Sequence, residues 1–240
     1  MRMAKRIGEV SAIYRYPVKS FRGERLEGCE VAEYGLRGDR VCSFYDETKE
    51  GWSRFVTARA IPDMLSYQAS YASEEVRIIG PDGSQYNWDD RLLEQIQSRS
   101  RKTLSMSAMF APNPESDELL SVDAASLLIL TDKTIREIEA KWGKELDELR
   151  FRPNLMVKLE EDEEEEQSWI GKRLRIGDAE LRVDSACERC SMITIDPATL
   201  ERDPSLLKQV NEHFQLNVGV YASVTKTGFI RMGDSLSLLD

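Results

Sequence analysis

The chain of 240 residues lacks groups that several common catalytic and binding sites require. Its one histidine, His213, excludes zinc sites built on paired histidines, and a Ser-His-Asp arrangement would have to use that residue. The four cysteines, Cys29, Cys42, Cys187 and Cys190, are too few and too unevenly spaced for a disulfide framework, which favours a reducing compartment. No G-x-G-x-x-G or G-x-x-x-x-G-K-[ST] motif occurs, so these two signatures for dinucleotides and nucleoside triphosphates are missing.

Long apolar runs and an excess of positive charge are missing as well. Even the longest apolar stretches are short, such as residues 127–130. We therefore expect no membrane anchor and no signal peptide, and we predict a cytoplasmic protein. Lys plus Arg total 33 against 43 for Asp plus Glu, and the formal net charge of −10 argues against a general affinity for nucleic acid or anionic membranes. An anionic ligand would need a local basic pocket.

The first half of the chain has the pattern of short strands separated by turns. A helix is predicted at residues 89–99, where Leu92, Leu93 and Ile96 have helical spacing. The polar stretch 111–118 predicts a connection, so we divide the chain into domains 1–115 and 116–240. β-branched and aromatic residues predict strands at residues 9–16, 26–34, 41–46, 64–71 and 76–79.

The second half combines two predicted helices with more strands. One helix begins at Thr131 or Asp132 and ends at Gly143, and the other runs from Asp203–Pro204 to about residue 214. Strands outnumber helices in both halves without regular alternation, which predicts a mainly β fold with a few helices, in the α+β class. The strands are predicted at residues 155–159, 173–176, 180–183, 192–195 and 218–226.

An acidic run at residues 160–166 lies between two predicted strands. Seven consecutive carboxylates repel one another and resist burial, so we expect a solvated, mobile surface loop. A docking patch for a basic partner is the alternative. Both interpretations place the whole run outside the core.

The sharpest local feature is the sequence Cys187-Glu188-Arg189-Cys190. Two thiols three residues apart can both be aimed at one electrophile or metal, and the adjacent guanidinium favours the thiolate that attacks sulfur and binds soft metals. A structural zinc site would normally need a second Cys or His pair, which the chain does not supply. A thioredoxin-like motif would precede a helix, whereas residues 192–195 predict a strand. Buried, inert cysteines remain an alternative.

Four further fragments combine basic, hydroxyl and amide groups at predicted strand ends, at residues 16–20, 38–40, 56–59 and 151–154. Each fragment is weak evidence by itself, because a basic residue at a strand end is usually solvated. Together with the cysteine pair they offer cations and hydroxyls for a phosphate, and a thiolate for a soft metal. This combination suggests a phosphorylated metal cofactor.

The order of these fragments resembles the MOSC proteins with an N-terminal MOSC β-barrel domain, including the mitochondrial amidoxime-reducing component and its bacterial counterparts. The resemblance runs from about residue 7 to the closing fragment at residues 229–234. It rests on Tyr16-Pro17-Val18-Lys19-Ser20, Gly35-Leu36-Arg37-Gly38-Asp39-Arg40, Thr57-Ala58-Arg59, Arg150-Phe151-Arg152-Pro153-Asn154, Cys187-Glu188-Arg189-Cys190 and Ile195-Asp196-Pro197.

The resemblance implies two β-barrel-like domains with a molybdenum pyranopterin, the molybdenum cofactor, in the cleft between them. By position in the motif, Cys190 is the catalytic residue and protein thiolate on molybdenum, and Cys187 is its non-ligating partner. The residues implied to hold the cofactor are Lys19, Ser20, Arg40, Asp123, Arg152, Asn154, Arg189 and Tyr221. At two places the chain departs from the relatives, with Ala124-Ala125 after Asp123 and Ala60 after Arg59, and we expect different cofactor and substrate contacts there.

The function implied is reduction of small N-hydroxylated compounds by a molybdenum-dependent oxidoreductase that receives electrons from a separate electron-donor protein. No pyridoxal-phosphate domain is recognised in the sequence. Two alternatives stay open. One is a non-catalytic carrier or insertion protein for the molybdenum cofactor or its sulfur, and the other is a sulfur carrier that uses a Cys190 persulfide without molybdenum.

Overall fold

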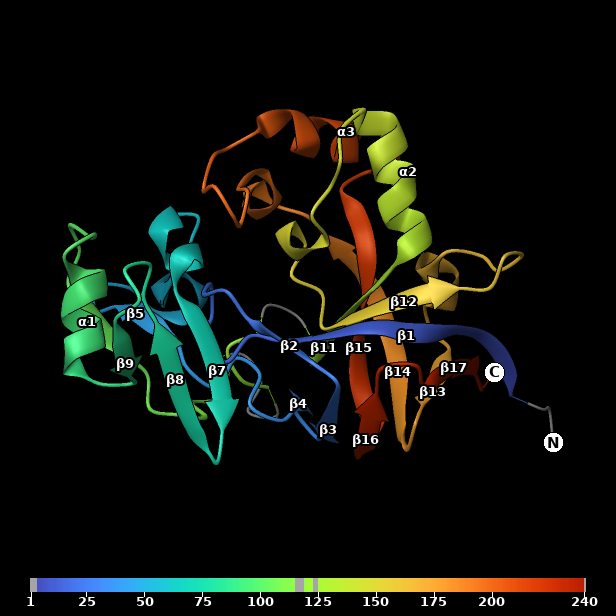
Figure 1. The fold of residues 1–240 in the computed structure, drawn as a ribbon, viewed down its shortest axis with the longest axis horizontal. Helices are drawn as coiled ribbons and strands as arrows, with labels where there is room; N and C mark the ends of the chain where they lie inside the picture. The colour runs from blue at the N-terminus through green and yellow to red at the C-terminus, as the bar shows by residue number, and fades with distance from the viewer. Residues whose placement is uncertain (1–3, 115–118, 123–124, 240) are drawn as a thin grey trace.

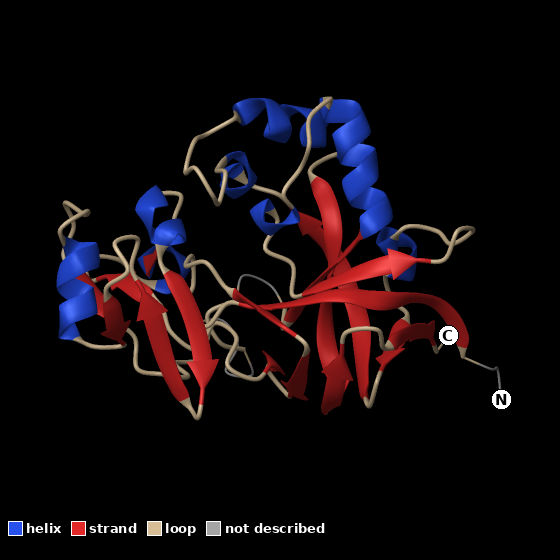
Figure 2. Cartoon of the chain, in the orientation of Figure 1, coloured by secondary structure: helices blue, strands red, loops and turns tan. Residues whose placement is uncertain are grey.

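The computed structural model describes residues 4–114, 119–122 and 125–239. Within these residues the chain is mainly β with a few helices, which confirms the predicted fold class (Figure 2). Figure 1 shows a smaller N-terminal part beside a larger part, where two helices lie over one end of the strands. The helices among the described residues are α1 (Asp90–Gln97) in the smaller part, and α2 (Asp132–Trp142) and α3 (Pro204–Phe214) in the larger part.

One sheet of the larger part closes on itself. Its strands are β12 (Leu155–Leu159), β11 (Leu127–Thr131), β15 (Asn217–Lys226), β14 (Ala179–Glu188), β13 (Arg173–Ile176), β17 (Ser235–Leu238), β1 (Lys5–Arg15) and β2 (Glu24–Leu26), in this order. Pairing of β1 with β12 closes the first seven strands into a barrel, and β2 extends from β1. β11 and β12 are parallel, whereas the other neighbours are antiparallel.

The N-terminal strand β1 therefore completes a barrel whose other six strands all follow residue 126. In its register, Ile13 lies opposite Leu155, and the Tyr14 amide donates to the Asn154 carbonyl oxygen at 2.8 Å. This pairing fixes the loop after β1 beside the loop before β12. The first loop carries Lys19 and Ser20 and the second carries Arg152 and Asn154, all of them predicted cofactor ligands.

The barrel interior is filled by aliphatic side chains that alternate with outward-facing residues along the strands. In β13, Leu174 and Ile176 are fully buried while Arg173 and Arg175 are exposed. β11 is buried along its whole length, which explains its continuous apolar sequence. The barrel core includes Ile7, Val10, Ile13, Leu127, Ile129, Leu155, Val157, Leu181, Val183, Val220 and Leu236.

The smaller part contains two three-stranded antiparallel sheets. These are β10 (Leu104–Met106), β5 (Phe44–Asp46) and β6 (Phe55–Val56), and β7 (Gln68–Ala72), β8 (Glu75–Ile79) and β9 (Gln85–Asn87). They share an aromatic core, in which Phe21 stacks on Tyr67 at 5.2 Å between ring centroids, and α1 buries Leu92 and Ile96. A third small sheet pairs β16 (Gly228–Arg231), from near the C-terminus, with β3 (Gly28–Ala32), which also pairs with β4 (Gly35–Leu36).

The three predicted helices are confirmed, and their ends follow from local chemistry. The Thr131 side chain caps α2 by accepting from the Thr134 amide, and Gly143 ends it in the left-handed region at φ 75°. Pro204 occupies the start of α3, and the Asp203 side chain accepts from the Ser205 amide. The strands predicted at 155–159 and 173–176 also match β12 and β13.

Some predicted strands are wrong. Residues 192–195 lie mostly in a 3₁₀ turn, Ser191–Thr194, in which the Thr194 hydroxyl donates to the Ser191 carbonyl oxygen at 2.7 Å. Residues 64–66 belong to another 3₁₀ turn, Pro62–Ser66, which starts with a proline that fixes φ for a turn. β14 is much longer than the predicted strand 180–183 and carries the chain as far as Glu188, two residues before Cys190.

The predicted division at residue 115 stays a prediction. None of the helices in the described ranges is sufficiently long and apolar to cross a membrane.

Candidate functional site

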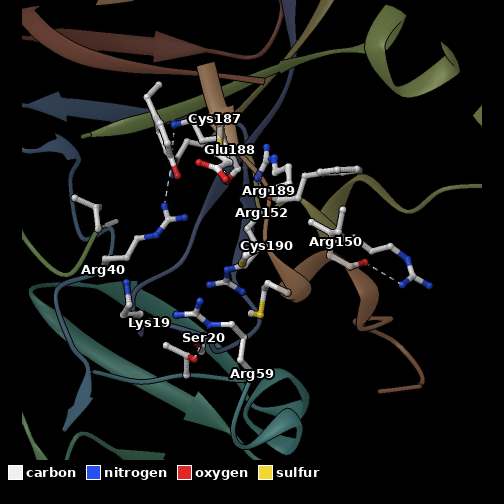
Figure 3. A pocket seen from close by; sticks show the side chains of 18 of the residues that line it. Lys19, Ser20, Arg40, Arg59, Arg150, Arg152, Cys187, Glu188, Arg189 and Cys190 are labelled. Atoms are coloured by element: carbon white, nitrogen blue, oxygen red, sulfur yellow. Dashed lines mark hydrogen bonds between the residues drawn. The ribbon is translucent and has the colours of Figure 1, made fainter. Parts of the chain in front are cut away.

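Residues from both halves of the chain line one pocket, shown in Figure 3. Every predicted site residue that the structure describes lies in its wall: Lys19, Ser20, Arg40, Arg152, Asn154, Arg189, Cys190 and Tyr221. Asp123 lies outside the described residues. The wall also contains Thr57, Arg59, Val122, Ala125, Leu128, Arg150, Phe151, Cys187, Glu188, Met192 and Ile193. The predicted site residues alone come from five separate segments of the sequence, which meet at one place.

The two cysteines of the pair have different environments. Cys187 is the ninth residue of β14 and is 1% exposed, whereas Cys190 follows the strand end and is exposed. Cys29 and Cys42 are also buried, and burial raises the pKa of both thiols. Of the four cysteines, Cys190 alone combines exposure with a place in the pocket wall. It is therefore the thiol best placed to bind a metal or attack an electrophile.

The pocket is strongly cationic in a chain of net charge −10. The only carboxylate side chain among its described lining residues is that of Glu188. Arg40 pairs with Asp39, and Arg150 pairs with Asp196 at 2.6 Å. The other cations favour an anionic ligand, because guanidinium groups match the geometry of phosphate oxygens. The cationic lining residues are Lys19, Arg40, Arg59, Arg150, Arg152 and Arg189. Arg59 and Arg150 lie in fragments that carry the family resemblance, although the resemblance implies no role for either residue.

The Arg189 guanidinium is fixed by two hydrogen bonds to backbone carbonyls, and its Nη2 group remains available to a ligand. Its Nε donates to the Val218 carbonyl oxygen at 2.7 Å and its Nη1 to the Phe151 carbonyl oxygen at 3.0 Å. The guanidinium also lies 5.0 Å from the centroid of the Phe151 ring. Nη2 is buried and has no hydrogen-bond partner among the described residues. A buried donor without a partner is costly, so this N–H favours a bound acceptor.

A network of three side chains fixes Arg40. Its Nη1 donates to the Asp39 carboxylate and, at 3.0 Å, to Asn154 Oδ1. Asn154 Oδ1 also accepts from the Leu128 amide at 3.1 Å, and its Nδ2 donates to Asp39 Oδ2 at 3.1 Å and to the Tyr14 carbonyl oxygen at 3.2 Å. The Asn154 amide is thereby fully used by the protein. Its geometry suits it to orient Arg40.

The Lys19 side chain lies between a backbone carbonyl oxygen and an aromatic ring. Its side chain is largely buried, with Nζ 2.8 Å from the Ser121 carbonyl oxygen to which it donates, and 5.1 Å from the centroid of the Phe55 ring. Ser20, Arg40 and Arg152 have positive φ values of 70°, 48° and 55°. Left-handed backbone at non-glycine residues is energetically costly, so the surrounding structure must hold these three residues in place.

The end of the acidic run differs from the prediction. Glu166 is buried, with 1% of its surface exposed. Its Oε2 accepts from the hydroxyls of Thr131 at 2.5 Å and Thr134 at 2.7 Å, and its Oε1 accepts from the Gly219 amide at 3.2 Å. Hydrogen-bond donors from three other elements, β11, α2 and β15, compensate the burial of this carboxylate. The prediction of a run that lies wholly outside the core is therefore wrong at Glu166.

Gly219, the backbone partner of Glu166, lies at an irregular step of the barrel next to the pocket. The pairing of β14 with β15 shifts register between Ala186 and Glu188, and Gly219 has φ 78°. A Cβ atom at Gly219 would lie 2.9 Å from the Ile129 carbonyl oxygen and 3.2 Å from Arg189 Nη2. The preceding carbonyl, at Val218, accepts from Arg189. Glu166 thus stabilises the segment of β15 that fixes Arg189.

Comparison with known protein families gives matches over nearly the whole chain. The family model of the MOSC domain matches residues 116–237, and that of the MOSC N-terminal beta barrel domain matches residues 7–125. The chain belongs to the MOSC-domain family. It is similar to mitochondrial amidoxime reducing component 2 of Homo sapiens, at 26% identity over 97% of this MOSC protein and 84% of the relative.

Two further proteins resemble this MOSC protein. The molybdenum cofactor sulfurase of Drosophila mojavensis is 31% identical over 55% of this chain, but the match covers only 16% of the sulfurase. The crystal structure of the YuaD protein from Bacillus subtilis aligns over 98% of both chains with a TM-score of 0.54 and 16% identity. The YuaD structure supports the fold alone.

Proposed function

We propose that this MOSC protein is an oxidoreductase that uses a molybdenum pyranopterin to reduce small N-hydroxylated compounds. The observation that carries the proposal is the combination of the exposed Cys190 thiol with six cationic side chains in one pocket. Similarity to an amidoxime reducing component over nearly the whole chain supports the reaction class. Electrons would come from a separate electron-donor protein.

The donor set fits such a cofactor. A thiolate is a good ligand for a soft, redox-active metal, and Cys190 is the thiol that faces the pocket while exposed. A phosphate needs cationic hydrogen-bond donors, and the buried Nη2 of Arg189 is one without a partner among the described residues. Lys19 and Arg40 would add charge from the opposite half of the chain.

When bound, the cofactor supplies a redox-active Lewis acid, which no side chain offers. The protein's own contribution is positioning and charge. Arg189 and Arg40 are each fixed by two or more hydrogen bonds, so their charges are oriented before any ligand arrives. Conversion of an N-hydroxyl group to N–H consumes two electrons and two protons and releases water, which is why a continuing supply of electrons is required.

A carrier of the molybdenum cofactor is the second candidate, favoured by the similarity of part of the chain to a molybdenum cofactor sulfurase. Turnover separates the two functions. Protein purified from a host that makes the cofactor is assayed for benzamidoxime reduction with a chemical reductant. The proposal expects catalytic turnover that depends on bound molybdenum. Bound molybdenum without turnover would support the carrier, and absence of both would reject both candidates.

A further inference from the structure

A second cavity, of about 530 Å³, shares Arg152 with the pocket that contains Cys190. Its volume lies in the range of small-molecule sites, which are typically about 300–1,000 Å³. Apolar and aromatic side chains form much of the wall, and several basic groups converge on it. The lining residues are Tyr14, Tyr16, Arg22, Gly23, Glu24, Arg25, Leu65, Gln68, Leu149, Arg152 and Pro197.

The charge in this cavity is positive after internal pairing. Its only described carboxylate, Glu24, forms an ion pair with Arg15 at 2.8 Å and accepts from the Tyr71 amide at 2.8 Å. Arg22 and Arg25 make no ion pair with any residue in the described ranges. In an acidic protein, two guanidinium groups without a carboxylate partner in one cavity favour an anion from outside.

Arg22 has most of its donor capacity left. Its side chain makes one hydrogen bond to the described residues, from Nη2 to the Pro197 carbonyl oxygen at 2.6 Å. Nε is buried without a partner among them. A guanidinium has five N–H donors in a planar fork, which suits a carboxylate. The one existing bond holds the fork in place, so little side-chain entropy is lost when an anion binds.

The rest of the cavity wall suits the apolar part of a small ligand. Leu65 and Pro197 are buried, and Tyr16 is 2% exposed, with its ring 4.2 Å from the guanidinium carbon of Arg152. The Tyr16 hydroxyl is buried and lacks a hydrogen-bond partner among the described residues, and burial raises its pKa, so it stays protonated. A ring or branched chain would displace water from this wall, while its charged end meets the arginines.

We propose that this cavity is a second binding site, for a small organic carboxylate with an aromatic or branched apolar body. Arg22 and Arg25 bind the carboxylate, and the tyrosines with Leu65 and Pro197 contact the body. The site shares Arg152 with the first pocket, but its own proposed ligands are Arg22 and Arg25. It needs neither Cys190 nor a bound cofactor.

Calorimetric titration of the full chain at low ionic strength tests the site, with benzoate as the probe and benzamide and inorganic phosphate as comparisons. Benzoate is expected to bind saturably, at least tenfold more tightly than neutral benzamide or phosphate, because hydrogen bonds to a charged group are worth about 1.5–3 kcal/mol and about 1.4 kcal/mol is tenfold. Equal affinity for benzamide, or for phosphate, would overturn the carboxylate assignment.

Variants locate the bound probe. Arg22→Gln should weaken benzoate binding at least tenfold, while Arg59→Gln, in the wall of the pocket that contains Cys190, serves as the matched control and should not change it. Arg25→Gln, at an exposed position, keeps the test valid if Arg22→Gln fails to fold. Absence of saturable benzoate binding, or a loss caused by Arg59→Gln and not by the cavity variants, would refute the second site.

Discussion

The buried carboxylate of Glu166 gives the sharpest prediction about stability. Replacing Glu166 with Ala removes an acceptor that receives three hydrogen bonds, from the hydroxyls of Thr131 and Thr134 and from the Gly219 amide. All three donors belong to buried residues or to the barrel wall, so water does not easily replace the lost carboxylate. We therefore expect a large loss of free energy of unfolding from a substitution within an acidic run.

The magnitude follows from the hydrogen bonds. A net contribution of about 1 kcal/mol for each bond gives about 3 kcal/mol for Glu166→Ala. For chains of 150–250 residues, a loss of this size lowers Tm by about 6–12 °C. Glu166→Gln should cost much less, because its oxygen can accept from the Gly219 amide and its NH₂ group can donate to the threonine hydroxyls. Burial raises the pKa of Glu166, so a neutral substitute also avoids a desolvation cost.

Urea unfolding of the purified chain at neutral pH measures these differences. Glu164→Ala is the matched control, because Glu164 belongs to the same run and is exposed. The expected order of stability is wild type and Glu164→Ala together, then Glu166→Gln, with Glu166→Ala lowest. If Glu166→Ala unfolds at the same urea concentration as Glu164→Ala, the hydrogen bonds assigned to Glu166 do not exist in solution.

Three further predictions concern charge and reactivity. In cofactor-free native protein, iodoacetamide should modify Cys190 far faster than the three buried cysteines, and mass spectrometry that finds a buried cysteine modified first would contradict the site geometry. Lys19→Ala should weaken retention of the anionic cofactor by about 1.5–3 kcal/mol, seen as less molybdenum per chain after dialysis; unchanged retention would exclude Lys19 as a ligand. Burial, followed by a neighbouring carboxylate, raises the pKa of Glu165 to about 7. The folded state therefore favours protonated Glu165, and the free energy of unfolding should fall as pH rises from about 4.5 to 7. If a Glu165→Gln variant shows the same fall, Glu165 is not its cause.

Local patterns predicted the elements whose ends are set by neighbouring residues. The α2 helix could be predicted because Thr131 caps it and Gly143 ends it within one segment of sequence. Long-range pairing left no such signal: nothing near β1 indicates that it joins β12 and β17 to close the barrel. The sequence 192–195 looks like a strand by composition, yet the turn that follows the cysteine pair determines its structure.

The candidate site was predicted mainly through the order of its fragments. Lys19, Arg40, Arg152 and Cys190 come from four segments, and no periodicity shows that these segments meet. Resemblance to a family supplied that information. The burial of Glu166 could not be predicted, because a run of carboxylates predicts one solvated loop. Its partners lie more than thirty residues away at Thr131, Thr134 and Gly219.

Molybdenum and pterin bound per chain test the central claim most directly. Wild-type protein, Cys190→Ser and Cys187→Ser are purified in parallel from a host that makes the cofactor, and circular dichroism confirms that all three are folded. The account predicts equimolar molybdenum and pterin in wild type, little change in Cys187→Ser, and loss of molybdenum in Cys190→Ser, because a hydroxyl is a poor ligand for a soft metal. Wild-type protein without molybdenum, or loss of molybdenum in Cys187→Ser but not in Cys190→Ser, would contradict it.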